Sequence, residues 1–282
     1  MRVLAGGLTL LLIAHSAGAQ EDAVCRPGKS SNEARTMASF GVPLAFSGAR
    51  APAKRERWSV DVGVEVTYIP KVDDATAIPT ICRADKTRPE NTDLLFALPR
   101  PRVLVSLPGN FTLEGSWVPP VRVSDVKANL FGIALARAIP LRGERLLLAL
   151  RAHASLGTVE APVTCDDQAL QDSTSPCYQG TRSNDSFHPN VFGGEATISW
   201  GLGGTLRPYL GAGYNHLAPR FRVNFTNRFG NVDRTRVVVD LDRAALFAGA
   251  TWTTNRLALS GEIYSAPADA VTGRVMMSYR LK

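Results

Sequence analysis

The feature that most constrains the fold is a strict alternation of apolar and polar residues that begins at residue 58. Within residues 58–68, one face carries Trp58, Tyr68 and the four valines between them, and the other face carries Asp61 and Glu65. Successive side chains of a β-strand point to opposite faces, so a period of two over this length indicates a strand and excludes a helix.

The same alternation recurs to the end of the chain and predicts about ten strands. They cover residues 58–68, 102–107, 111–118, 126–139, 146–156, 190–201, 207–228, 234–253, 257–265 and 271–281. Their connections alternate in length. Short turns are predicted near 108–110, 140–144, 202–205 and 254–256, and longer ones near 70–98, 119–125, 161–189 and 229–233.

Short turns at one end and longer loops at the other are typical of membrane-spanning barrels. We therefore predict an all-β fold over residues 57–282: a single antiparallel transmembrane β-barrel of about ten strands, within a range of 8–12, with longer extracellular loops. An even strand number places both termini on the short-turn, periplasmic side. The alternative is a soluble β-sandwich that buries the same apolar faces in a two-layer core.

The first 56 residues lack this pattern and fall into two parts. Residues 1–19 match a secretory signal peptide, with Arg2, an apolar run over residues 3–14 and small residues at 17–19. That run is shorter than the roughly 20 residues needed to span a bilayer. Residues 20–56 are predicted to form a periplasmic or lumen-associated segment, in which residues 37–46 are a further candidate strand that Pro43 weakens.

The charge balance argues against a nucleic-acid partner. Without Arg2 of the predicted signal peptide, 31 basic and 25 acidic residues remain, a net charge of +6. An exported chain in which charges of both signs alternate does not carry the concentrated basic patch that nucleic acid requires. A modest positive excess suits a surface near anionic outer-membrane lipid or lipopolysaccharide, and ordinary solubility explains it equally well.

The even number of cysteines in an exported chain predicts two disulfides. Cys165 and Cys177 lie in one polar segment and would close a short loop, which leaves Cys25 and Cys82 as the second pair. A zinc site is the rival interpretation, but the Cys-x-x-Cys spacing and neighbouring histidines of such sites are missing. We expect no metal and no cofactor.

The alternating faces also assign side chains to the two sides of the barrel wall. Aromatic residues at strand ends predict two interfacial girdles, formed by Trp58, Tyr68, Trp117, Trp200, Trp252 and Tyr279. Charged residues on inward faces predict a lumen network of opposite charges, formed by Asp61, Glu65, Glu114, Arg151, Glu195, Glu262 and Arg274. Because barrels of this size are largely filled by their own side chains, we expect a mostly filled lumen.

The chain resembles the small outer-membrane β-barrel proteins of Gram-negative bacteria, the OmpA-like or porin-like barrels. Residues 207–214, with the sequence Arg-Pro-Tyr-Leu-Gly-Ala-Gly-Tyr, and the closing strand at 275–281 carry this general resemblance. It implies a cell-envelope location in the outer membrane and insertion by the barrel-assembly machinery. Family members often end in an aromatic residue, whereas here Tyr279 is followed by Arg280, Leu281 and Lys282.

Three functions remain open at this point. The first is a non-enzymatic barrel with a structural or surface-binding role. The second is a narrow channel for small solutes. The third is a membrane-embedded hydrolase that uses Asp166, Asp167, Asp185 and His188 of the loop after residue 160. We favour the first function and therefore predict that the protein is not an enzyme. The oligomeric state stays open. Arginines of one hairpin are candidate contacts for lipopolysaccharide phosphates, namely Arg220, Arg222, Arg228, Arg234 and Arg236.

Overall fold

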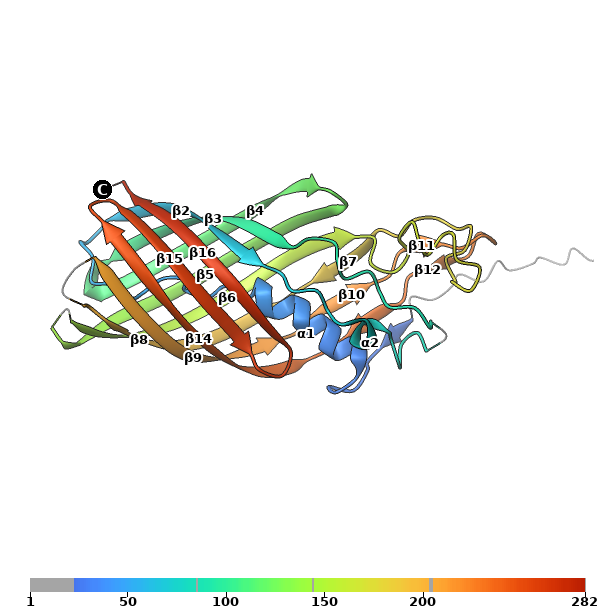
Figure 1. Cartoon of the computed structure of the whole chain (residues 1–282), viewed down its shortest axis with the longest axis horizontal. Coiled ribbons are helices and arrows are strands. Elements are labelled where there is room, and N and C mark those ends of the chain that lie inside the picture. Colours follow the sequence, from blue (N-terminus) through green and yellow to red (C-terminus); the bar gives the residue numbers. More distant parts are fainter. Residues whose placement is uncertain (1–22, 85, 144, 203–204, 282) are drawn as a thin grey trace, which may run out of the picture.

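The barrel of the computed structural model is closed, antiparallel and ten-stranded, as predicted (Figure 1). The model describes residues 23–84, 86–143, 145–202 and 205–281, so the predicted signal peptide lies outside the described residues. The barrel strands are β2 (Val60–Tyr68), β3 (Ala97–Leu107), β4 (Phe111–Val123), β5 (Val126–Arg142), β6 (Leu146–Ala161), β8 (Val191–Trp200), β9 (Leu206–Leu217), β14 (Leu241–Thr254), β15 (Leu257–Ala266) and β16 (Ala270–Arg280).

Two pairings close the ring. Strand β16 pairs with β2, which sets Arg280 opposite Asp61, and β6 pairs with β8, which sets Arg151 opposite Glu195. Each remaining barrel strand pairs with its sequence neighbours in the barrel. The 3-10 turn η1 (Pro108–Asn110) lies at one end with the β5–β6, β8–β9 and β14–β15 connections, the start of β2 and the end of β16. We call this the short-turn end and the opposite one the long-loop end.

Short strands continue the barrel wall at the long-loop end. Strands β7 (Asp185–His188), β10 (Arg220–Arg222), β13 (Arg236–Val238) and β1 (Val24–Cys25) extend the sheet beyond β6 in that order. Beyond them lies the hairpin of β11 (Phe225–Thr226) and β12 (Val232–Asp233), visible at the far end of Figure 1. The connection between β2 and β3 holds the one-turn helix α2 (Asp74–Ala77).

Three predicted boundaries are wrong in this region. The expected strand over 234–253 is divided into β13 and β14 (Leu241–Thr254). The expected strand over 207–228 ends at Leu217, because Pro219, which has no N–H to donate to a ladder, separates β9 from β10. The expected long loop at 119–125 is a tight turn, since β4 continues to Val123 and β5 begins at Val126. The two strands simply extend further toward the long-loop end than their apolar alternation does.

The candidate strand at residues 37–46 is also wrong, because that part of the chain is helical. Helix α1 spans Asn32–Leu44, and the hydroxyl of Ser31 caps it by accepting a hydrogen bond from the Ala34 amide at 3.2 Å. Buried apolar residues recur along it at helical spacing, namely Ala34, Met37, Ala38 and Val42. Pro43 falls in the last turn, where it ends the helix instead of breaking a strand.

The segment that follows α1 passes down the inside of the barrel. Strand β1 pairs with β13 at the long-loop end, and α1 contacts β2, β15 and β16 (Figure 1). The described chain therefore starts at the long-loop end and crosses the lumen before β2 begins. This corrects the expectation that both termini lie at the short-turn end. An even number of strands places the start of β2 and the end of β16 on the same side of the barrel. It does not place the segment before β2, which runs through the lumen.

The outer surface of the barrel is apolar, as the alternation predicts. Large hydrophobic side chains that would be buried in a two-layer sandwich are exposed on every side, including Val64 at 43%, Ile133 at 57% and Ile263 at 64%. A contiguous exposed apolar surface of this extent is compatible with lipid and not with water. The sandwich alternative is therefore excluded.

Candidate functional site: the filled lumen and the long-loop end

The lumen is occupied by residues 32–57, which we call the plug. Helix α1 ends inside the barrel, where its last carbonyls have no partner within the helix. Arginines of the wall supply those partners. Arg100 donates to the Leu44 carbonyl at 3.3 Å, and Arg274 donates to the carbonyls of Val42 and Pro43 at 3.3 Å each. Positive charge at this position also suits the negative end of the helix dipole.

Below the helix, Phe46 lies in a cage of three guanidinium groups. The carbon Cζ atoms of Arg102, Arg151 and Arg100 lie 4.1, 5.1 and 5.6 Å from the centre of its ring. Cation–π contacts of this kind are strongest when water is excluded, and Phe46 is completely buried. Gly132 makes room for the ring, because a Cβ atom there would lie 2.9 Å from it.

The same arginines hold the plug backbone. Arg102 donates to the carbonyl of Ser47 at 2.5 Å and to that of Gly48 at 3.0 Å, and Arg151 donates to the carbonyl of Phe46. Extended chain inside a barrel needs such partners, since a buried carbonyl without a donor is costly. The wall thus recognises the plug mainly through its backbone.

Glutamates of the wall balance these arginines. Arg102 lies 2.8 Å from Glu65, and Arg151 lies 3.2 Å from both Glu114 and Glu195. Opposite charges that lie this close offset part of the cost of removing each from water. The buried set contains four of each sign, namely Arg100, Arg102, Arg151 and Arg274 with Glu65, Glu114, Glu195 and Glu262.

A second cluster closes the lumen nearer the short-turn end. Asp61 lies 2.7 Å from both Arg50 and Arg55 of the plug and 3.4 Å from Arg280 of β16. Further up, the Ser47 hydroxyl donates to Glu262 at 2.6 Å. Side-chain contacts therefore join the plug to the wall from Val42 to Arg55, and the lumen of the described chain is filled over that length.

The seven residues predicted for the lumen network are all buried. The structure places Arg151 opposite Glu195 and Glu262 opposite Arg274, as neighbour pairing suggests. Sequence reasoning missed Arg100 and Arg102. Arg102 is the first residue of the predicted second strand, and Arg100 lies two residues before it. Both fall on the inward parity of β3, so extending its alternation two residues backward through Pro101 would have found them.

The predicted girdle residues all face outward. The exposed fractions of the six side chains range from 36% for Trp200 to 61% for Trp58. Trp117 stacks on Phe131, with ring centres 6.1 Å apart. Their placement at the two lipid–water interfaces stays a prediction.

Both predicted disulfides are present. Cys25 is bonded to Cys82, which ties β1 to the β2–β3 connection, and Cys165 is bonded to Cys177 within the β6–β7 connection. Both disulfides therefore cross-link segments at the long-loop end.

The loop carboxylates and His188 do not form a catalytic pair. Asp185 and His188 are three residues apart on β7 and point to opposite faces. Asp185 is buried and accepts hydrogen bonds from the amides of Thr164 and Asn224, at 2.7 and 2.9 Å. Asp166 caps a turn, and Asp167 lies 3.5 Å from Arg182. These hydrogen bonds and ion pairs anchor the loop at its base. None of these three carboxylates contacts the imidazole of His188.

Asp185 is nevertheless perturbed by its surroundings. Burial raises the pKa of Asp185 to about 6, although the two amides and the Ser183 hydroxyl act in the opposite direction. Such a group binds a proton at a pH where an exposed aspartate has lost it.

The predicted arginine cluster is partly assembled. Arg220 and Arg222 of β10 and Arg236 of β13 point to the outer face of the extension, where Arg222 lies directly opposite Arg236. Arg234 lines the same depression as Arg222, and Arg26, which the sequence analysis missed, lines another with Arg236. Arg228 lies apart, against Tyr178 and Phe229 near the β11–β12 hairpin.

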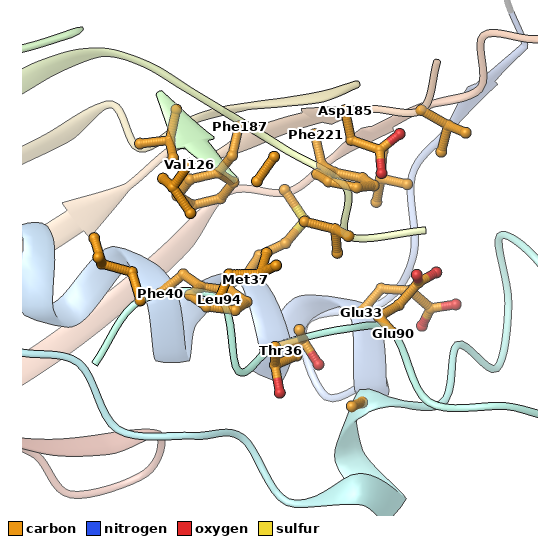
Figure 2. A pocket seen from close by; sticks show the side chains of 18 of the residues that line it. Glu33, Thr36, Met37, Phe40, Glu90, Leu94, Val126, Asp185, Phe187 and Phe221 are labelled. Atoms are coloured by element: carbon orange, nitrogen blue, oxygen red, sulfur yellow. The ribbon is translucent and has the colours of Figure 1, made fainter. Parts of the chain in front are cut away.

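An apolar, partly open cavity of about 130 Å³ lies beside helix α1 of the plug (Figure 2). Helix α1, the β2–β3 connection and the inner side of the extended wall line it. Apolar side chains make up most of its lining, among them Met37, Phe40, Leu94, Val126, Phe187 and Phe221.

No helix of the described residues is both long and apolar enough to cross a membrane. No group of three or more His, Cys, Asp or Glu side chains in that part of the chain is arranged to hold a metal ion.

Comparisons with known proteins found matches among solved structures only. No protein-family model and no curated protein matches the chain. Among solved structures, Ail of Yersinia pestis, in complex with the heparin analogue sucrose octasulfate, is 10% identical, with 79% of this chain and 97% of that chain covered and a TM-score of 0.27. The toluene transporter TodX of Pseudomonas putida is 10% identical, with 87% and 71% covered and a TM-score of 0.33.

Omp33 of Acinetobacter baumannii is 8% identical, with 79% of this chain and 98% of that chain covered and a TM-score of 0.29. Likeness at this level assigns no ligand and no activity to this chain. Its closed ten-strand barrel, with large apolar side chains exposed around the outside, makes it an outer-membrane β-barrel protein.

Proposed function

We propose that this protein is a non-enzymatic barrel with a sealed lumen, which acts by binding at its long-loop end. The observation that carries this proposal is the plug, whose backbone is held by buried arginines from Val42 to Gly48. A path for solutes would require these contacts to break. A narrow channel is the alternative function, and it demands a plug that moves under ordinary conditions.

The partner that best fits the outer face of the extension is the phosphate of lipopolysaccharide. Arg222 and Arg236 lie directly opposite each other on neighbouring strands, so two guanidinium groups share one patch of the outer face. Ser186 of β7 lies next to Arg222 and offers a hydroxyl beside it. Guanidinium groups bind phosphate oxygens in pairs, so an anionic headgroup suits this patch.

A binding experiment with lipid A tests this partner. Protein in nanodiscs of neutral lipid should bind bis-phosphorylated lipid A more tightly than lipid A without phosphates, and affinity should fall with added salt. The double variant R222Q/R236Q should bind at least tenfold more weakly, since each charge-assisted hydrogen bond contributes about 1.5–3 kcal/mol.

The matched control removes two arginines from the short-turn end. The variant R145Q/R256Q changes the net charge equally, and both residues are exposed there. It should bind lipid A as the unchanged protein does. Equal losses in the two double variants would mean that only net charge matters, and the proposed face would be rejected.

A further inference from the structure

The four charged side chains that line the cavity beside α1 are engaged with the protein. The Glu33 carboxylate accepts hydrogen bonds from the amides of Thr80, Ile81 and Cys82 at 2.6–2.9 Å. Glu90 lies 2.6 Å from Lys86 and 3.5 Å from Arg83, and Asp185 accepts hydrogen bonds from two backbone amides. A charged ligand would have to displace these contacts.

Water is a poor occupant of the interior. A buried water needs two to four polar partners, whereas the middle of this cavity is walled by Met37, Phe40, Leu95, Phe187 and Phe221. An empty apolar space forfeits dispersion contacts on all its walls. An apolar occupant would restore them without leaving any polar atom unsatisfied.

The volume indicates the size of that occupant. Engineered apolar cavities of about 150 Å³ in another protein bind benzene or xenon, and this cavity has a volume of about 130 Å³. Leu44 and Leu98 line the cavity on the side of Arg100, which we call its floor. Directly below, Arg100 binds the Leu44 carbonyl, so the plug separates the cavity from the rest of the lumen.

We propose that this cavity binds a neutral, hydrocarbon-like molecule the size of a single ring, held between α1 and the wall at the long-loop end. Met37 lies against the ligand from the helix, and Phe187 and Phe221 lie against it from the extended wall (Figure 2). Because the plug forms the floor, the site retains its ligand at the long-loop end. It is independent of the arginine face, which lies on the outer side of the same strands.

The methionines provide the test. Three of them lie in the described residues: Met37 in the cavity, Met276 buried in the lumen below, and Met277 exposed at 55% on the outer surface. Their methyl groups can be labelled with carbon-13 and followed by NMR in nanodiscs during titration with benzene. Met277 reports benzene that partitions into lipid, and Met276 reports any general change in the lumen.

The proposal predicts a saturable shift of the Met37 signal, a shift of Met277 that grows in proportion to benzene, and an unchanged Met276. Filling the cavity with A161L or, separately, A128L should weaken the Met37 response at least tenfold, since both alanines line the cavity and are buried. The control A152L adds the same side chain to the outward face of β6. It should leave the response unchanged.

Other outcomes overturn the proposal. A Met37 shift that follows Met277 without saturation would mean partition into lipid only. An undiminished Met37 response in either filled variant, with its heat-modifiable gel mobility intact, would place the ligand elsewhere. Equal binding of benzoate would reject the neutral ligand class, because the cavity offers no unpaired cation to the carboxylate.

Discussion

Replacing Arg102 with methionine removes a side chain that joins the plug to the wall at several points. Its guanidinium lies 2.8 Å from Glu65, donates to the carbonyls of Ser47 and Gly48, and covers the ring of Phe46. Methionine keeps the length and the apolar stem but none of these polar contacts. The variant therefore isolates the contribution of the guanidinium group.

The expected loss follows from what remains buried. Removing one member of a buried ion pair costs about 3–5 kcal/mol, because the other charge is left without its partner. Each carbonyl without a donor adds about 1–3 kcal/mol. Neighbouring terms are not additive, and Thr67 still donates to Glu65 at 2.7 Å. We therefore expect the free energy of unfolding to fall by about 4 kcal/mol.

Urea unfolding in liposomes, followed by tryptophan fluorescence and by heat-modifiable gel mobility, measures this loss. The double variant R102M/E65Q should lose less than R102M alone, because it buries no unpaired charge. The control R142M removes an exposed arginine from the end of β5 and should change stability by less than about 0.5 kcal/mol. If R102M were as stable as the control, the arginines would not hold the plug, and the reasoning would be refuted.

Three further predictions concern the long-loop end and the membrane boundary. Replacing Cys25 and Cys82 with serine should lower the free energy of unfolding by about 4 kcal/mol, and replacing Cys165 and Cys177 should lower it by about 3 kcal/mol. The first loss is larger because that disulfide closes the longer loop, and equal losses in urea unfolding would contradict this order. Since burial raises the pKa of Asp185 to about 6, the folded state binds a proton that the unfolded state has released between pH 4 and 6. The free energy of unfolding should therefore fall as pH rises through that window, and D185N should abolish this slope. Single-tryptophan variants that retain Trp117 or Trp200 should be quenched most by lipids brominated near the headgroup; maximal quenching at the bilayer centre would reject the girdle assignment.

The barrel could be predicted because the alternation of apolar and polar residues that defines its strands is a local feature of the sequence. Alternation with a period of two places one face in lipid and the other in the lumen, so Val64 and Glu65 report opposite environments from sequence alone. Pairing of adjacent strands then follows from chain order, which brought Arg151 to Glu195 and Glu262 to Arg274. The cysteine pairing followed from counting and spacing.

The plug could not be predicted in the same way, because it depends on what lies across the lumen. Nothing next to Arg102 in the sequence indicates that its partners are the carbonyls of Ser47 and Gly48, more than 50 residues earlier. The helix itself carried a signal, since Ser31 and the spacing of Ala34, Met37 and Ala38 are helical. The strand pattern of the barrel alone predicts a weak strand around Pro43, which instead lies in the last turn of α1.

The cavity could not be predicted from the sequence either. Its walls come from α1, the β2–β3 connection and the extension of the wall, which meet only after the barrel has closed. The arginine face could be predicted in part, because Arg220, Arg222 and Arg236 alternate with half-buried Phe221 and buried Val237. Arg26 joins them through the parallel pairing of β1 with β13, which local patterns do not indicate.

Electrical recording across planar lipid bilayers tests most directly whether the plug seals the barrel. With its disulfides intact and insertion verified by gel mobility, the unchanged protein should show no steady conductance. The variant R102M/R151M, in which the carbonyls from Phe46 to Gly48 lose these donors, should show openings. Long-lived, uniform conductance steps from the unchanged protein would contradict a sealed lumen and would favour the narrow channel.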